Sequence, residues 1–279
     1  MATTSPYKNW EDLTISDDYM FKLVMRRKRI CKKMLERILK VKIFDITYLE
    51  TEKSMTATPD SKGIRLDVYV EDDQHTVYNV EMQVRQLQGS ALQKRARYYQ
   101  STIDTDLLLA GYSYDELNKV IIIFICPFDP FGLGRHIYTF RNYCQEDKDL
   151  ELGDGATKIF LNSKGTMNDV DNKVKAFLDY VEGILSDDDL VQEMEQEIEQ
   201  VKKIEQERMS YMTFVARMTE ERNEGRREGR REGIREGETN AILKMLQSHM
   251  PMRDIAQIMQ WPVDKIHEIA VANKIPITD

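Results

Sequence analysis

The sequence is poor in the side chains that hold zinc and other soft metal ions. It contains 3 cysteines and 4 histidines in 279 residues, and they are scattered without the short spacings of a zinc site. An odd number of distant cysteines fits a reducing compartment better than a disulfide framework, so we expect a cytoplasmic protein. A bound metal ion would need oxygen ligands, which favours Mg²⁺ or Mn²⁺.

Long apolar runs are also missing. The longest one, Val120 to Cys126, is far shorter than the roughly 18–20 residues of a membrane span. Residues 1–6 lack the basic and apolar regions of a signal peptide. Charged residues make up 32% of the chain and hydrophobic residues 41%, a composition that can fold in water. We therefore expect no membrane partner.

The chain has little net positive charge to offer a nucleic acid. Its formal net charge is −8, whereas phosphate contacts need a basic surface. The charge is uneven, however, because residues 22–42 are basic with Glu36 as their one acid, and acidic residues crowd positions 187–199. Two interpretations of the basic stretch stay open: a local nucleic-acid surface, or a solvated helix face.

Proline is absent between Pro130 and Pro251. Because Ser186 and the three aspartates after it form a strong helix start, we expect one very long helix, or two with a break, from that point. Glycine recurs every fourth residue from Gly225 to Gly237, and each costs about 1 kcal/mol against alanine in a helix. The repeat is either a flexible linker or a helix whose glycine stripe contacts a neighbour, as in a homodimer or higher oligomer.

Residues 1–185 show a mixed helix and strand pattern, which predicts an α/β domain. Its expected helices cover residues 16–40, 90–109 and 170–185, and a loop covers 56–62. The expected strands cover residues 43–50, 64–70, 76–84, 119–126, 136–143 and 157–161. A helical, glycine-repeat extension then spans 186–238, and a small helical cap spans 239–279. The last two helices of the cap, at 252–259 and 262–272, have the proportions of a helix-turn-helix.

Two of these strands bring acidic residues together. Ile64–Val70 and Thr76–Val84 both alternate between apolar and polar residues and are joined by a polar turn. Pairing Asp67 with Glu81 places the apolar residues on one face and Asp67, Glu81 and Gln83 on the other, and a slip of one residue would scramble both faces. Either this is the solvent-facing side of an edge hairpin, or it is a metal site.

The chemistry of phosphodiester hydrolysis explains the second interpretation. A metal ion must bind the scissile phosphate, activate water and stabilise the transition state. Asp67, Glu81 and the backbone carbonyl of Met82 would hold the ion and leave positions open for water and phosphate. Gln83 projects onto the same face and would orient the water.

The residues around the hairpin resemble a known nuclease superfamily. Arg65-Leu66-Asp67-Val68 and Val80-Glu81-Met82-Gln83 are similar to the active-site core of PD-(D/E)XK nucleases. They are closest to the recombination-promoting nuclease / putative transposase family, in which glutamate-x-glutamine replaces glutamate-x-lysine. Further segments match in order, at residues 18–22, 95–99, 111–114, 120–123 and 160–165. The resemblance implies a restriction-endonuclease-like mixed sheet flanked by helices, with a long C-terminal helical extension.

By the same resemblance the protein is a Mg²⁺-dependent DNA endonuclease that acts in recombination, mobile elements or phage defence. Asp67 and Glu81 would bind the metal, and Gln83 would take the lysine position without its positive charge. Asp17 or Asp18 either adds a carboxylate or caps the first helix. The expected DNA contacts are Arg95, Tyr99, Lys94 and Arg65, with Gln100 as a weaker candidate and core packing as the alternative for Tyr99. The alternative function is a weak or inactive DNA-binding or assembly protein that keeps the nuclease fold.

Overall fold

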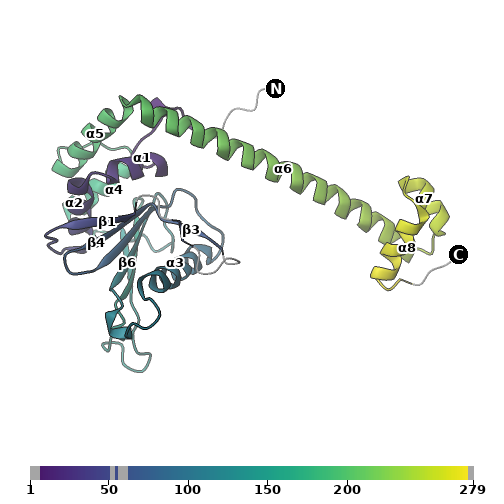
Figure 1. The fold of residues 1–279 in the computed structure, drawn as a ribbon, viewed down its shortest axis with the longest axis horizontal. Coiled ribbons are helices and arrows are strands. Elements are labelled where there is room, and N and C mark those ends of the chain that lie inside the picture. The colour runs from purple at the N-terminus through teal and green to yellow at the C-terminus, as the bar shows by residue number, and fades with distance from the viewer. Residues whose placement is uncertain (1–6, 51–53, 56–61, 276–279) are drawn as a thin grey trace. The chain divides into compact units, whose positions relative to one another are not determined.

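The computed structural model describes residues 7–50, 54–55 and 62–275 of the chain. The predicted loop at 56–62 therefore lies, apart from Lys62, outside the described residues. A central sheet has the strand order β1-β4-β5-β6-β8-β7, in which β5, β6 and β8 are parallel and the other pairs antiparallel (Figure 1). Its strands are β1 (Ile46–Glu50), β4 (Val68–Asp72), β5 (Val77–Met82), β6 (Val120–Cys126), β7 (Ile137–Phe140) and β8 (Ala156–Asn162). The short strands β2 (Ser54–Met55) and β3 (Ile64–Arg65) pair with each other.

The helices confirm the predicted α/β class. Up to the end of the sheet domain they are η1 (Trp10–Asp12), α1 (Asp18–Met25), α2 (Lys28–Leu39), α3 (Ala91–Leu107), η2 (Tyr114–Glu116), α4 (Asn172–Val181) and α5 (Asp189–Lys202). The single helix predicted at 16–40 is two helices, because Arg27 takes an extended conformation. The Tyr48 hydroxyl donates a hydrogen bond to the carbonyl of Met25, at the end of α1. The strand predicted at 64–70 also divides, at Leu66 and Asp67, between β3 and β4.

The sheet is covered on both faces. Helix α3 packs Leu92, Ala96 and Ile103 against the aromatic side chains of Phe124 and Phe160. Helices α1, α2, α4 and α5 lie on the opposite side of the sheet (Figure 1). The central strands β5 and β6 are therefore almost entirely buried, as the apolar run at 120–126 predicts for a strand inside a covered sheet.

The register of the hairpin is the predicted one. Val68 lies opposite Val80, and Val70 opposite Tyr78, so the preceding step brings Asp67 opposite Glu81. The hairpin is not a solvent-facing edge, since β4 and β5 lie between β1 and β6. Glu81 is only 2% exposed. Glu81 is thus inside the sheet domain, beneath α3, whereas the side chain of Asp67 is met by Lys22 of α1.

The basic stretch at 22–42 and the acidic stretch at 187–199 neutralise each other. Ion pairs join α2 and the residue before it to α5 and its N-cap: Arg27–Glu197 at 2.6 Å, Arg29–Glu193 at 2.9 Å, Lys33–Glu193 at 2.9 Å and Arg37–Asp188 at 2.6 Å. Most of the charge that we considered for a nucleic-acid surface is used within the fold. The interpretation as a charged helix face agrees better with the structure, although this face contacts α5 as well as solvent.

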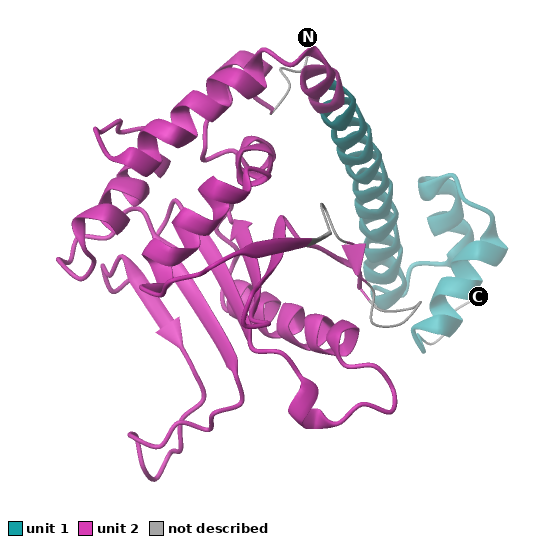
Figure 2. Cartoon of the chain, turned by 60° about the vertical axis from the view of Figure 1, so that its left-hand side comes forward, with its two compact units in different colours: residues 1–5, 212–279 teal, residues 6–211 magenta. Residues whose placement is uncertain are grey.

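The compact unit that contains the sheet runs from Pro6 to Tyr211 (Figure 2). Helix α5 belongs to it, because Leu190, Val191, Met194, Ile198 and Val201 are buried. The boundary that we expected after residue 185 therefore omits a helix that completes the core. The first residues of α6 (Glu205–Gln247) are attached to this unit as well, since the Tyr211 hydroxyl donates to the carbonyl of Lys8 at 2.8 Å.

Residues 212–279 form a second unit, with most of α6, α7 (Met252–Met259) and α8 (Val263–Ala272). The glycine repeat is helical, and a Cβ added at any of its four glycines would meet no described atom within 4 Å. The cap has its own small core, which includes Ile242, Ile255 and Ile266. Residues 240–275 contain four lysines and arginines and three acidic residues. Helices α7 and α8 therefore carry little of the net positive charge that DNA binding needs. No helix within the described residues has the length and apolar character to cross a membrane.

Candidate active site

Each of the two carboxylates accepts a hydrogen bond from the backbone of the other segment of the hairpin. Glu81 Oε1 accepts a hydrogen bond from the Asp67 backbone N–H at 3.1 Å. Asp67 Oδ2 accepts one from the Met82 backbone N–H at 3.2 Å. Both side chains are thereby fixed at the point where β4 begins and β5 ends, as the predicted register requires.

Arg95 of α3 lies over this pair. Its Nη2 is 3.1 Å from Glu81 Oε2, its Nη1 donates to Gln83 Oε1 at 2.7 Å, and its Nε donates to the Tyr99 hydroxyl at 2.8 Å. The guanidinium carbon also lies 4.8 Å from the centre of the Tyr99 ring, a favourable cation–π position. The structure therefore brings together Glu81, Gln83, Arg95 and Tyr99, four of the residues selected from the sequence.

Gln83 is engaged at both ends of its amide. Its oxygen accepts from Arg95, and its nitrogen donates to the backbone carbonyl of Arg85. It is also buried, with 6% of its surface exposed. In this arrangement Gln83 holds Arg95 in place; its expected role in orienting water stays a prediction.

Helix α1 contributes a lysine that was not selected from the sequence. Lys22 is 9% exposed, and its Nζ lies 3.1 Å from Asp67 Oδ1. Its spacing of four from Asp18 puts both residues on one helix face, a signal that we read only as part of the basic stretch. Asp18 is exposed, and its charge acts on Asp67. Asp17 instead accepts from the Thr14 backbone N–H at 2.8 Å and pairs with Lys8.

Burial makes both carboxylates hard to ionise. It raises the pKa of Glu81 well above the usual value, the charge of Asp67 raises it further, and Arg95 opposes the shift. Burial also raises the pKa of Asp67, against the opposing effect of Lys22. Two close carboxylates without full solvation are a combination that a divalent cation relieves.

The donor set fits a hard cation that keeps several water ligands. In the described ranges there is no group of three or more histidine, cysteine or acidic side chains that could hold a metal ion, so the protein ligands would be two carboxylates and a carbonyl. The N–H and C=O of one strand residue face the same side, so the Met82 carbonyl points to the side of Asp67. Asn79, on the Glu81 face, is fully buried, and hydrogen bonding from its side chain favours the ionised form of Glu81.

The remaining DNA-contact candidates differ in burial and in their partners. Lys94 is exposed on α3, and Arg65 is half-buried on β3. Gln100 donates to Asp104 at 2.9 Å, which turns its amide to another partner. Tyr99 is 5% exposed and packs in the core, where its hydroxyl accepts from Arg95; its contact with DNA stays a prediction.

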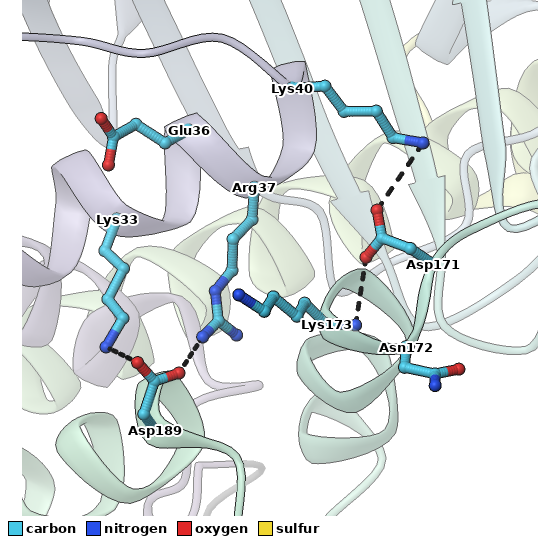
Figure 3. A pocket seen from close by; sticks show the side chains of 8 residues that line it. All are labelled: Lys33, Glu36, Arg37, Lys40, Asp171, Asn172, Lys173 and Asp189. Carbon is cyan, nitrogen blue, oxygen red and sulfur yellow. Dashed lines mark hydrogen bonds and ion pairs between the residues drawn. The ribbon is translucent and has the colours of Figure 1, made fainter.

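A separate pocket of about 700 Å³ lies between α2, α4 and α5 (Figure 3). It contains none of the candidate site residues. Three of its cations are already paired, Lys33 and Arg37 with Asp189 and Lys40 with Asp171 (Figure 3). We therefore assign the candidate chemistry to Asp67 and Glu81 rather than to this pocket.

Comparison with known proteins agrees with the geometry. A family model described as PD-(D/E)XK nuclease family transposase matches residues 15–235. This segment begins before α1, includes the whole sheet and ends within α6. No curated protein and no solved structure matched the chain. From the extent of the family match, over most of its length, the chain belongs to the PD-(D/E)XK nuclease family transposases.

Proposed function

We propose that the protein is a metal-dependent endonuclease that hydrolyses phosphodiester bonds in DNA. The observation that carries the proposal is the pair Asp67 and Glu81, which hydrogen bonds to backbone N–H groups hold together and whose pKa values burial raises. Membership of the family supports a nuclease-like or transposase-like function. The metal, the DNA substrate and a role in recombination, mobile elements or phage defence are our proposal.

Asp67, Glu81 and the Met82 carbonyl would hold Mg²⁺ or Mn²⁺, which when bound supplies a Lewis acid for the phosphate and lowers the pKa of water. The protein contributes fixed geometry. The two backbone N–H groups orient the carboxylates, so little reorganisation is needed when substrate arrives.

Arg95 would supply the positive charge that a lysine at position 83 would otherwise provide. Its guanidinium is held by Gln83, Glu81 and Tyr99 and is partly exposed, with 34% of the side-chain surface accessible. A guanidinium at a cleavage site stabilises negative charge as it develops on phosphate oxygens. The neutral glutamine is then a positioning residue for an arginine from another helix.

Replacing Arg95 by methionine should lower the single-turnover cleavage rate by about 10²–10³-fold, the usual cost of losing one group that stabilises transition-state charge. Arg95→Lys should recover part of the rate, since it restores the charge without the planar fork. The exposed Arg97 on the same helix gives the matched control, Arg97→Met. A parent-like rate for Arg95→Met would remove Arg95 from the chemistry.

The proposal as a whole is tested with supercoiled circular DNA. The purified chain should nick or linearise the circle with Mg²⁺ or Mn²⁺ and leave it intact when the metal is chelated. A circular substrate has no ends, so its cleavage shows endonuclease action. Intact DNA with both metals, or equal cleavage with chelator, would contradict the proposal.

One observation favours the alternative of an inactive DNA-binding or assembly protein. Each carboxylate already has a side-chain cation, Lys22 on Asp67 and Arg95 on Glu81. For an inactive protein, calorimetry would detect no Mn²⁺ binding, and Glu81→Gln would leave DNA affinity unchanged.

We also propose that the chain forms a homodimer or higher oligomer through α6. Its repeat presents rows of glutamate, glycine and arginine along a helix whose glycines contact no described neighbour. Opposite charges in such rows can pair with a second copy of the same helix. Sedimentation of the full chain and of a chain that ends at Tyr211 would test this: only the full chain should be oligomeric.

A further inference from the structure

We propose that Lys22 is a built-in counter-ion of the metal site. Its ammonium occupies Asp67 while no metal is bound, and it moves to a phosphate of the DNA when the metal binds. The inference rests on the proposed function, because it requires a metal ion at Asp67.

The contacts of Asp67 show which oxygen is involved. Oδ2 accepts from the Met82 backbone, a contact that is part of the hairpin. Oδ1 lies 3.1 Å from Lys22 Nζ. Oδ1 is therefore held by a flexible side chain, and it is the oxygen that can be released to a metal without disturbing the sheet.

Lys22 lies in a fixed helix but at the end of a flexible stem. Met20, Phe21 and Val24 of α1 are fully buried, so the backbone of α1 is firmly packed. A lysine is rarely buried unless it is paired, and Asp67 is the only carboxylate in the described chain that lies within ion-pair distance of Lys22. A methionine of similar length would pack in the same space without the cost of desolvating a charge.

An ammonium and a divalent cation beside the same carboxylate oxygen repel each other. Metal binding to Asp67 Oδ1 therefore favours release of Lys22, and the released ammonium is stabilised by a new anion. Asp18 lies one turn earlier on the same helix face, but its carboxylate is exposed to solvent, where an ion pair with Lys22 would contribute little. A DNA phosphate at the metal brings the required negative charge next to Lys22, so the same side chain protects the empty site and binds the substrate.

This dual role predicts opposite effects of one substitution. Lys22→Met should bind Mn²⁺ at least about tenfold more tightly than the parent in calorimetry without DNA. A neighbouring cation shifts the pKa of a carboxylate by roughly 1–3 units, and in this variant the metal no longer has to replace that cation at Asp67. At saturating metal it should cleave DNA about 10²-fold more slowly, since a charge on the phosphate is lost. Lys22→Arg should keep parent-like metal affinity and much of the cleavage rate.

Lys28→Met is the matched control, because Lys28 forms an exposed ion pair with Asp45 at 2.7 Å; both measurements should equal those of the parent. If Lys22→Met does not fold, Lys22→Gln carries the same test. Parent-like or weaker metal affinity in a folded variant would overturn the counter-ion role, and an unchanged rate at saturating metal would overturn the transfer to phosphate. If the parent itself binds no metal, the proposed function fails, which is a different result from failure of the Lys22 proposal alone.

Discussion

Glu81→Gln is expected to abolish metal-dependent cleavage and to make the metal-free protein more stable at neutral pH. The variant loses a proposed metal ligand, so we expect its cleavage rate to fall by at least about 10³-fold, the upper end of the range for one removed electrostatic group. The side chain keeps its size and still reaches the backbone N–H of Asp67. The substitution removes a buried negative charge beside Asp67. Burial and repulsion from Asp67 both oppose the ionisation of Glu81.

The pH dependence of unfolding gives this prediction its sign. A glutamate in the unfolded chain titrates near its ordinary pKa of 4.5, whereas the pKa of folded Glu81 is raised well above that value. As the pH rises above about 4.5, the unfolded chain releases this proton before the folded chain does, so the free energy of unfolding falls until the folded pKa is passed. Glu81→Gln has no such proton to lose. The two melting temperatures should converge near pH 4, and the variant should melt at the higher temperature at pH 8.

Metal should reverse the order. Saturating Mg²⁺ binds the folded parent and raises its melting temperature at pH 8 by mass action, whereas it should leave Glu81→Gln almost unchanged. Glu151→Gln is the control, because Glu151 forms an exposed ion pair with Arg141 and should alter neither melting nor cleavage. A lower melting temperature for metal-free Glu81→Gln at pH 8 would mean that its ion pair with Arg95 outweighs the cost of burying the charge.

The hairpin was predictable because its information is local. Alternation in two adjacent strands determines the register, and the register alone places Asp67 beside Glu81. The apolar run at 120–126 likewise predicts a strand covered on both faces, which the structure confirms. These features depend on residues that are close together in the chain.

The partners of the carboxylates were harder to predict because they depend on distant packing. Lys22 and Asp67 meet only after α1 folds onto the sheet, and from the sequence Lys22 is one of several cations in a basic stretch. Four of those cations, Arg27, Arg29, Lys33 and Arg37, find acids more than 150 residues away, on α5 and its N-cap. A charge pattern shows which residues are charged but not which of them lie together.

The role of Gln83 shows the same limit. The sequence has a neutral residue where related nucleases have lysine, and we inferred a missing positive charge. The structure places Arg95, from the next helix, against both Gln83 and Glu81. The positive charge that position 83 lacks is therefore supplied beside it by Arg95.

Ending the chain after residue 185 is expected to unfold the sheet domain, whereas ending it after Tyr211 should leave the domain folded. Helix α5 buries Leu190, Val191, Met194, Ile198 and Val201. Burial of each such side chain contributes about 1.5–3 kcal/mol, so their loss is comparable to the whole stability of about 5–15 kcal/mol of a typical domain. The shorter chain also leaves Arg37, whose side chain is 8% exposed, without Asp188.

The longer truncation keeps the contacts that end the domain. Trp10 Nε1 donates to the Lys202 carbonyl at 3.1 Å, and the Tyr211 hydroxyl donates to the Lys8 carbonyl; both pairs remain in the chain that ends at Tyr211. Circular dichroism should show cooperative thermal unfolding for that chain and none for the chain that ends at residue 185. Cooperative unfolding of the shorter chain would contradict the assignment of α5 to the core. The chain that ends at Tyr211 keeps Lys22, Asp67, Glu81 and Arg95, so its metal affinity should equal that of the full chain. It lacks the part of α6 that we propose to be the oligomer contact, so any difference in DNA cleavage would measure the contribution of the second unit.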